Sequence, residues 1–340
     1  MISTHDSRLE ADTAQSVPLL GINWMLDSGY GAGVLGINIV LELCRTRSIR
    51  PVLFSKPGRI VVDPLSARLL EWAATPTNIP DGNASVRIPM VYTTGDDFVH
   101  EMHVKTEGPK FAIMAFENTR FSDASRSRNI FDRVFTESSW NADILRDRGF
   151  MNVVNWTQGV DTSVFHPAPK RGVFGERFVI YSGGKLEYRK GQDLVVTAFK
   201  KFAETHSNAL LVVTWYNPWI EHARTINYSP HTSPLPVDAA GKADVAQWLA
   251  NQGLARNQFV VIDYVPNAMT PSVLRECDVA LFPNRAEGGT NLVAMEALAC
   301  GVPSILAANT GQLDLVGDVP CFPLREQAPI PSLSDNYDTE

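Results

Sequence analysis

Short apolar runs alternate with stretches of helical periodicity along nearly the whole chain, and the alternation is interrupted once. In the first half, the runs that we expect to form strands are residues 19–25, 51–55, 88–92, 111–116, 133–137 and 152–156. In the second half they are residues 178–182, 209–215, 259–264, 279–283 and 303–307. Strands that alternate with helices are typical of a parallel sheet with helices on both faces. The pattern predicts an α/β protein with two Rossmann-like, doubly wound halves.

Helical periodicity fills the spaces between these runs. We expect helices at residues 34–44, 138–148, 193–205, 238–251, 271–277 and 292–300. Ser138 or Ser139 is suited to be the N-cap of the second of these helices, and Gly149 is suited to end it.

Prolines and a basic stretch with a glycine interrupt the pattern near the middle of the chain. Pro167 and Pro169 precede Lys170-Arg171-Gly172, which favours a linker within residues 161–175. A length of 340 residues suits two domains. We therefore predict a flexible N-terminus at residues 1–17, an N-terminal domain at 18–168 and a C-terminal domain at 169–340. Two such domains leave a cleft between them, and ligands bind at the carboxyl ends of such strands.

The net charge and the cysteine content indicate which kinds of partner and which cellular compartment to expect. The net charge is −7 and no block of Lys and Arg stands out, which disfavours nucleic acid as a partner. The four cysteines form no C-x-x-C pair, which favours free thiols and a cytoplasmic location. The polar N-terminus lacks the apolar core of a signal peptide. The sequence contains no run of 18 apolar residues, so we expect no membrane-spanning helix. A peripheral membrane contact remains open.

A loop with glycines and cations follows the expected strand 178–182. Gly183, Gly184 and Lys185 come first, and Arg189 and Lys190 stand before the next helix. Glycines allow close approach to the backbone, and cations beside a helix N-terminus favour an anion, most plausibly phosphate. The alternative is a solvated basic loop.

A second loop of this kind follows the expected strand 279–283. Glu287 is followed by Gly288 and Gly289, and Thr290 or Asn291 is suited to cap the helix that begins there. Paired glycines expose backbone N–H groups beside the positive end of the helix, which again suits a phosphate.

Glu296 is the only charged side chain between Gly288 and Gln312. It lies in an otherwise apolar helix, where an unpaired carboxylate is costly. Two interpretations follow. The carboxylate either pairs with a cation of its own domain or accepts hydrogen bonds from the hydroxyl groups of a ligand.

Glycines also follow the first expected strand. Gly31, Gly33 and Gly36 spell G-x-G-x-x-G, but the next strand ends in Lys56 and lacks the acid that reads a ribose in dinucleotide-binding proteins. A tight turn is the alternative.

Three further features admit both a functional and a structural interpretation. His100 and His103 are spaced for a metal, and Asp96-Asp97 resembles a metal-binding pair, but a solvated helix face and a turn are favoured and we predict no metal site. Trp215 and Trp219 follow a strand, where aromatic rings either stack on a base or sugar or pack within the loop.

Three motifs in order resemble one known family. Glu287…Glu296-Ala-Leu-Ala-Cys-Gly-Val-Pro-Ser-Ile looks like the two-glutamate motif of the retaining, family 4-type glycosyltransferases of GT-B architecture. The segment from Ser182 to Gly191 resembles the G-R-L-x-x-x-K-G phosphate loop of that family, with Lys185 in the place of its Arg and Lys190 matching its Lys. Upstream, Ser138–Trp140 and the Gly159-Val160-Asp161…Phe165…Pro167 pattern resemble the motifs that end its N-terminal domain.

The resemblance implies roles for these positions. Lys185 and Lys190 would bind the donor diphosphate, Glu287 would lie near the donor sugar and Glu296 would hold the ribose hydroxyls. Further donor-binding positions would be Gly33, which faces the donor across the cleft, Gly184, and the amides of Asn291 and Leu292. No metal or cofactor is implied, because the cations and the helix dipole act on the phosphates and the nucleotide-sugar is itself the donor substrate.

This sequence also departs from the family in three places. The family commonly spaces its two glutamates eight positions apart, and Glu287 and Glu296 are nine apart, which puts Glu287 in doubt more than Glu296. Where the family often has a histidine after an N-domain strand, this chain has Glu117 and Asn118, which we expect either to line the acceptor or sugar pocket or to cap locally. Members of the family usually carry more chain after the second glutamate, including a terminal helix, so truncation is open.

The sequence thus predicts an enzyme that moves a sugar from a nucleotide-diphosphate donor to a hydroxyl of an unknown carbohydrate, lipid or protein acceptor. Retention of configuration is implied by the resemblance alone. The alternatives are a GT-B phosphorylase or epimerase, and a glycosyltransferase-like binding or regulatory protein without turnover.

Overall fold

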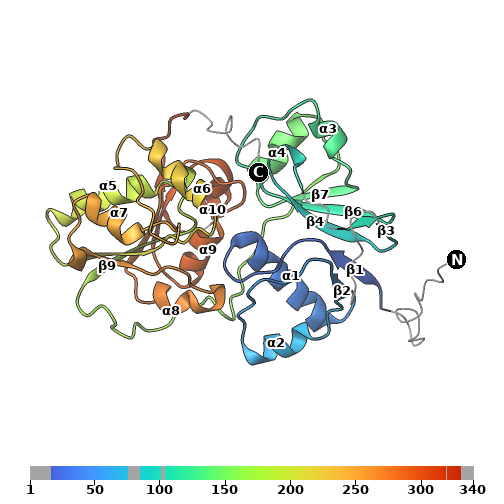
Figure 1. Ribbon diagram of the computed structural model, residues 1–340, viewed down its shortest axis with the longest axis horizontal. Coiled ribbons are helices and arrows are strands. Elements are labelled where there is room, and N and C mark those ends of the chain that lie inside the picture. Colours follow the sequence, from blue (N-terminus) through green and yellow to red (C-terminus); the bar gives the residue numbers. More distant parts are fainter. Residues whose placement is uncertain (1–16, 76–84, 101–103, 319, 331–340) are drawn as a thin grey trace.

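The computed structural model describes residues 17–75, 85–100, 104–318 and 320–330. Figure 1 shows two lobes, one coloured from blue to green and the other from yellow to red, and each is built on its own sheet. The prediction of two doubly wound α/β halves is confirmed. The predicted flexible N-terminus lies outside the described residues except for Val17.

The first sheet belongs to the N-terminal domain and is parallel throughout, in the order β2-β1-β4-β6-β7-β8. The chain runs outward from β1 to β2 and then crosses to the other side of β1, so the two winding directions meet between β1 and β4. Its strands are β1 Leu19–Ile22, β2 Arg50–Leu53, β4 Met90–Thr94, β6 Lys110–Met114, β7 Arg133–Thr136 and β8 Val153–Asn155.

Helices cover both faces of this sheet, and a small parallel pair of strands lies beside it. The elements are α1 Gly31–Thr46, α2 Pro64–Leu70, β3 Ser85–Val86, the 3-10 turn η1 Asp96–Phe98, β5 Lys105–Thr106, α3 Ser125–Arg128 and α4 Ser139–Asp147. Helix α1 begins earlier than predicted, and it buries Val34, Ile37 and Val40 against the sheet. This one-sided apolar stripe is what fixes the helix on the sheet.

The second sheet repeats the same winding in the order β11-β10-β9-β12-β13-β14, again parallel. The switch in winding direction now lies between β9 and β12, so the loops after these strands leave in opposite directions and form a crevice. The strands are β9 Phe178–Gly183, β10 Ala209–Thr214, β11 Phe259–Val261, β12 Val279–Phe282, β13 Ser304–Ala307 and β14 Phe322–Leu324.

The helices of the second half differ in length from the prediction more than the strands do. They are η2 Tyr188–Lys190, α5 Gln192–Ala203, α6 Ile220–Arg224, η3 Thr225–Tyr228, α7 Val245–Asn251, η4 Arg256–Gln258, η5 Asn267–Met269, α8 Pro271–Leu274, α9 Leu292–Ala299, η6 Thr310–Gln312 and α10 Leu313–Asp318. The predicted helix at 238–251 is wrong in its first half. The Asp238 carboxylate accepts the backbone N–H groups of Ala240 and Lys242, and Gly241 has φ +79°, which closes a turn instead.

The segment between β8 and β9 crosses from one domain to the other and contains the predicted boundary at 168–169. Phe165 packs in the core beneath β9 and β12. Farther on, the Glu276 carboxylate accepts the backbone N–H groups of Arg171, Gly172 and Val173 at 2.6–3.0 Å. These bonds attach the crossing segment to the C-terminal domain just after α8.

The two domains touch directly through polar contacts at the ends of their helices. Ser138, one of the two predicted candidates, is the N-cap of α4, and its hydroxyl also donates to the carbonyl of Gly288 at 2.5 Å. The next backbone N–H, that of Ser139, donates to the carboxylate of Asp314 on α10 at 2.8 Å. The first turn of an N-terminal-domain helix is therefore bonded by the C-terminal domain.

The cysteines are free thiols, as the sequence predicts. Cys44, Cys277 and Cys300 are buried, and Cys321 is partly exposed. Buried thiols of this kind pack as small apolar side chains.

Candidate functional site

A cavity of about 370 Å³ lies between the two domains, at the carboxyl ends of both sheets. This is the edge at which doubly wound sheets present their loops. Its N-terminal-domain lining includes Gly29, Tyr30, Gly31, Glu117, Glu137 and Gln158, and its C-terminal-domain lining includes Gly184, Lys185, Arg189, Lys190, Glu287, Asn291, Leu292 and Glu296. Most of the predicted site residues are thus brought together.

The loop after β9 opens the C-terminal wall of the cavity. Gly184 has φ +106° and open space where a side chain would stand, so its backbone is accessible to a ligand. The Lys185 ammonium lies 2.9 Å from the Glu187 carboxylate and over the ring of Trp219, 5.2 Å from its centre. This lysine is one third exposed, and the cavity is its open side.

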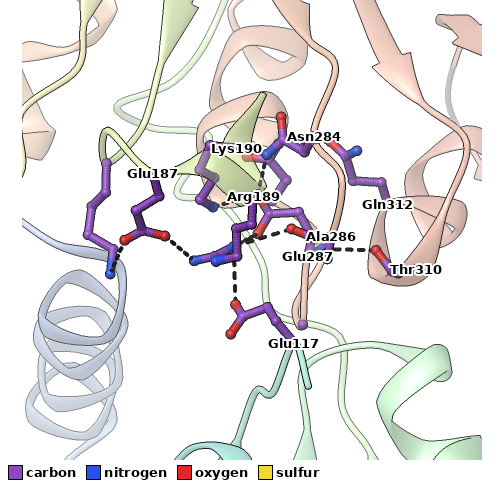
Figure 2. A network of polar contacts seen from close by, with 12 residues as sticks. Glu117, Glu187, Arg189, Lys190, Asn284, Ala286, Glu287, Thr310 and Gln312 are labelled. Atoms are coloured by element: carbon purple, nitrogen blue, oxygen red, sulfur yellow. Dashed lines mark hydrogen bonds and ion pairs between the residues drawn. The ribbon is translucent and has the colours of Figure 1, made fainter. Parts of the chain in front are cut away.

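Arg189 is the centre of a network of ion pairs that the sequence analysis did not identify (Figure 2). Its guanidinium lies 3.0 Å from Glu187 and 3.2 Å from Glu287, both of the same domain. It also lies 3.2 Å from Glu117, which follows β6 of the other domain. The arginine therefore joins the two walls of the cavity.

Lys190 and Glu287 form the second pair of this network. The Lys190 ammonium lies 2.5 Å from the Glu287 carboxylate, and Asn284 donates to the same carboxylate oxygen. Although burial opposes ionisation, Lys190 and Arg189 hold the pKa of Glu287 below its ordinary value. The nine-residue spacing has not removed Glu287 from the cavity, since it is buried beside both cations.

Glu187 shows how strongly these cations act. It is buried, which disfavours its charge, yet Arg189 and Lys185 lower the pKa of its carboxyl to about 2. Three carboxylates and three cations thus share one small volume. Such mutual neutralisation holds the cations in place before a ligand arrives.

The loop after β12 is held tightly against the N-terminal domain. A Cβ on Gly288 would lie 2.6 Å from the carbonyl oxygen of Phe116, so only glycine fits there. Asn291 is the N-cap of α9, and its side chain accepts the N–H of Ala294. It is one of the two candidates that the sequence offers, the other being Thr290. Its φ is +66°, which asparagine tolerates better than most residues. Asn291 and Leu292 line the cavity at this helix end.

Glu296 points into the cavity from α9 and has no cation beside it among the described residues. Its partner is the side-chain amide of Asn267, which donates a hydrogen bond to it. Burial raises the pKa of Glu296 to about 8, although the bond from Asn267 opposes the shift. Of the two interpretations left open by the sequence, the ion pair within the domain is absent from this part of the chain.

Two predicted residues lie beside the cavity rather than in it. A Cβ on Gly33 would lie 2.4 Å from the carbonyl oxygen of Asp27, so this glycine permits close packing of α1 on the preceding loop. Asn118 accepts the N–H of Arg120 with its side chain, which is the local cap that stood as the alternative. Glu117 and Gly31 are the neighbours that do line the cavity.

The carboxylates of η1 make local contacts. Asp96 accepts the backbone N–H groups of Glu117 and Asn118, and Asp97 accepts the backbone N–H and the hydroxyl of Ser122. His103 lies outside the described residues. No group of three or more His, Cys, Asp and Glu side chains that could hold a metal ion occurs in the ranges that the structure describes.

The aromatic residues after β10 divide between the two interpretations. Trp215 is buried and packs edge-on against Trp248. Trp219 is 42% exposed, lines the cavity and meets the ring of Tyr30 from the other domain at 5.7 Å. Trp219 is therefore the ring that a ligand can reach.

Sequence reasoning also missed Glu137, which follows β7 and lines the cavity. Its position between Thr136 and Ser138 could have suggested it, because it stands directly after a strand end. The expected strand 133–137 includes Glu137, and this residue belongs to none of the three family motifs.

Known proteins resemble the C-terminal domain in sequence. Residues 168–319 match the family model described as Glycosyl transferases group 1. The GDP-mannose-dependent alpha-(1-6)-phosphatidylinositol monomannoside mannosyltransferase of Mycobacterium tuberculosis is 30% identical over 166 residues, which are 45% of this chain. That match spans 37% of the length of the mycobacterial relative.

Solved structures resemble the fold of both domains. HepE of Anabaena, in complex with UDP-glucose, superposes with a TM-score of 0.60 at 14% identity, over 90% of this chain and 85% of HepE. The sucrose-phosphate synthase of Thermosynechococcus elongatus does so with a TM-score of 0.57 at 14% identity, over 88% of this chain and 82% of the synthase. The predicted GT-B architecture is confirmed by these likenesses in fold.

None of the helices in the described part of the chain is long and apolar enough to cross a membrane.

Proposed function

We propose that this protein is a glycosyltransferase that takes a sugar from a nucleotide-diphosphate donor and places it on a hydroxyl group, because residues 168–319 match the glycosyl transferases group 1 family model. The observation that carries the proposal is the convergence of Lys185, Arg189 and Lys190 on one interdomain cavity that Glu296 also lines. Cations supply a diphosphate site, and a carboxylate without a cation supplies a site for ribose hydroxyls.

The donor diphosphate lies, in this proposal, against the loop after β9 and the first turn of α9. Lys185 and Lys190 would neutralise its oxygens, and the accessible backbone at Gly184 and the amides of Asn291 and Leu292 would donate to it. As the bond between the sugar and the diphosphate breaks, negative charge grows on the diphosphate. Cations already held by Glu187 and Glu287 stabilise that charge without first having to reorganise.

The two glutamates have separate tasks. Glu287 lies beside Lys190, and in this proposal it would accept hydrogen bonds from the donor sugar next to the diphosphate. Glu296 lies deeper in the C-terminal domain, beside Asn267, and would hold the ribose. The family resemblance supports retention of the anomeric configuration and catalysis without a metal.

The names of the relative and of the structural neighbours suggest which donors and acceptors to test first. The mycobacterial relative is named as GDP-mannose-dependent, and HepE is in complex with UDP-glucose, so these two nucleotide-sugars are the first donors to test. The relative is named for phosphatidylinositol monomannoside, which makes a lipid-linked sugar one candidate for the acceptor.

The test is a thermal unfolding series with UDP-, GDP-, ADP- and dTDP-sugars. A ligand present at about 100 times its Kd stabilises the fold by about 2.7 kcal/mol, which is a readily measured rise in Tm. One nucleotide class should raise Tm and should be consumed on incubation. Glu296→Ala should weaken its binding about tenfold at neutral pH, since a hydrogen bond of an uncharged carboxyl contributes about 0.5–1.5 kcal/mol. A protein that binds none of the four classes contradicts the proposal, and binding without consumption would favour a regulatory relative.

A further inference from the structure

Glu137 stands apart from the other carboxylates at the N-terminal end of the cavity. Glu117, Glu187 and Glu287 are each within 3.2 Å of the Arg189 guanidinium. The Glu137 carboxylate has no hydrogen bond or ion pair with any residue that the structure describes, although it is half-buried and lines the cavity. Burial, and after it the negative charge of Glu117, raise the pKa of Glu137 to about 7.

Gln158 shares this situation. It follows β8, is 8% exposed and lines the same cavity, and its amide has no partner within the described ranges. A Cβ on Gly289 would lie 2.9 Å from a carboxylate oxygen of Glu137 and 3.3 Å from the amide nitrogen of Gln158. Both polar groups therefore lie beside the α-carbon of Gly289, and the absence of a side chain on this glycine leaves room for them.

Polar groups that face a cavity and have no protein partner are open to a ligand, and one ligand group can satisfy both of them. A carboxylate accepts hydrogen bonds, and an amide both donates and accepts them. Phosphate is a poor ligand here, because the Glu137 carboxylate would repel it and the nearest cation, Arg189, is already paired with Glu117, Glu187 and Glu287. A hydroxyl group, which donates to the carboxylate and accepts from the amide, satisfies the pair.

We propose that Glu137 and Gln158 bind the acceptor at the hydroxyl group that receives the sugar, and that the acceptor presents an uncharged sugar or polyol at this point. The inference rests on the proposed glycosyl transfer. The acceptor is favoured over the donor sugar because both residues come from the N-terminal wall, whereas Lys185, Lys190 and Glu296 fix the donor on the C-terminal wall. Ionised Glu137 accepts the hydrogen bond of the hydroxyl, the Gln158 amide donates to one lone pair of its oxygen, and the second lone pair stays free for the reaction.

The experiment compares wild-type protein with Glu137→Gln, Glu137→Asp and Gln158→Leu. Glu107→Gln is the control, since Glu107 is an exposed glutamate of the same domain. The nucleotide-sugar that raises Tm most is the donor, and methyl α-D-mannopyranoside, methyl α-D-glucopyranoside and myo-inositol are the acceptor probes. The donor Kd, the acceptor KM and kcat, and Tm are measured for each variant.

We expect Glu137→Gln and Gln158→Leu to raise the acceptor KM at least about tenfold, in line with the loss of a hydrogen bond to a charged or buried group. Donor Kd should stay close to wild type, and Tm should stay the same or rise for Glu137→Gln, because that change removes a poorly solvated charge. Glu137→Asp should recover part of the loss in KM, and Glu107→Gln should match wild type. An unchanged acceptor KM overturns the inference, and so does a donor Kd that weakens as much as the acceptor KM. Wild-type protein that hydrolyses its donor but consumes it no faster with any probe excludes the uncharged polyol, whereas failure to bind any nucleotide-sugar contradicts the proposed function instead.

Discussion

The two walls of the cavity treat charge in opposite ways. On the C-terminal wall, Lys185, Arg189 and Lys190 each contact a glutamate, so positive and negative charges neutralise one another. On the N-terminal wall, Glu137 has no partner among the described residues, and it lies near Glu117, which adds more negative charge. One wall is organised before any ligand binds, and the other is left unsatisfied.

This difference between the two walls suggests how the diphosphate of the donor and the hydroxyl group of the acceptor each gain binding free energy. A diphosphate enters a set of cations whose positions are already fixed, so its binding costs little reorganisation. A hydroxyl group on the opposite wall removes the cost of a desolvated carboxylate that lacks a partner. Five substitutions, grouped in four experiments, test this contrast in order of expected effect.

Arg189→Ala should have the largest effect, because it leaves Glu187 and Glu287 buried without the guanidinium between them. Removing one partner of a buried ion pair costs about 3–5 kcal/mol, and donor turnover should fall at least a hundredfold. Urea unfolding and donor consumption measure the two effects. Arg146→Ala is the control, since its pair with Asp143 is exposed and contributes about 0–1 kcal/mol. Equal losses in both variants would refute the idea of a neutralised wall.

Gly288→Ala and Gly289→Ala compare the rigid and the adaptable side of the interface. The new Cβ at 288 meets backbone atoms of Phe116 at 2.6–2.9 Å, so the domains must separate, at a cost of about 1–3 kcal/mol. At 289 the nearest atom is the flexible end of Glu137, at 2.9 Å, and the cost should be smaller. Unfolding free energies and small-angle scattering distinguish the two. A larger loss for Gly289→Ala would mean that Glu137 is fixed in place.

Glu296→Gln should remove a pH dependence. In the folded protein the pKa of Glu296 is about 8, against an ordinary value of 4.5, so folding binds a proton in this window and the free energy of unfolding falls as the pH rises through it. Between pH 5 and pH 8 the variant should gain about 1–3 kcal/mol relative to wild type. Chemical denaturation at both pH values measures this, and a constant difference would show that the carboxylate is ionised throughout.

Asn118→Ala should have the smallest effect. Its side chain caps the N–H of Arg120 rather than lining the cavity, and loss of a cap costs about 0.5–2 kcal/mol at most. Donor Kd and acceptor KM should stay within twofold of wild type. A selective rise in either constant would restore Asn118 to the pocket, where the sequence had placed it as one of two alternatives.

The sequence predicts the sheets and the loops of the C-terminal wall well. Apolar runs mark buried parallel strands, and the glycines and charges after strands 178–182 and 279–283 lie at the edge that forms the cavity. Glu296 could be singled out because it is the one charge in an apolar helix. These are local signals, which a single sequence carries.

Contacts between distant segments could not be predicted in the same way. Arg189 pairs with Glu117, which is 72 positions earlier, and the sequence showed Arg189 only as one cation of a basic loop. Glu137 stands out only because it has no hydrogen-bond or ion-pair partner among the described residues, and a single sequence does not show this. The helix expected at 238–251 failed because the carboxylate of Asp238 competes for backbone N–H groups over the first residues.

The contact between Asp314 and the N-terminus of α4 makes one helix a reporter of motion between the domains. The backbone N–H of Ser139 is bonded by a carboxylate of the other domain, while the Ser138 hydroxyl donates to Gly288 across the same boundary. If the domains swing apart to admit substrate, both bonds break together, and the first turn of α4 meets solvent. Protection of the Ser139 amide from hydrogen exchange then reports the free energy of opening the cleft.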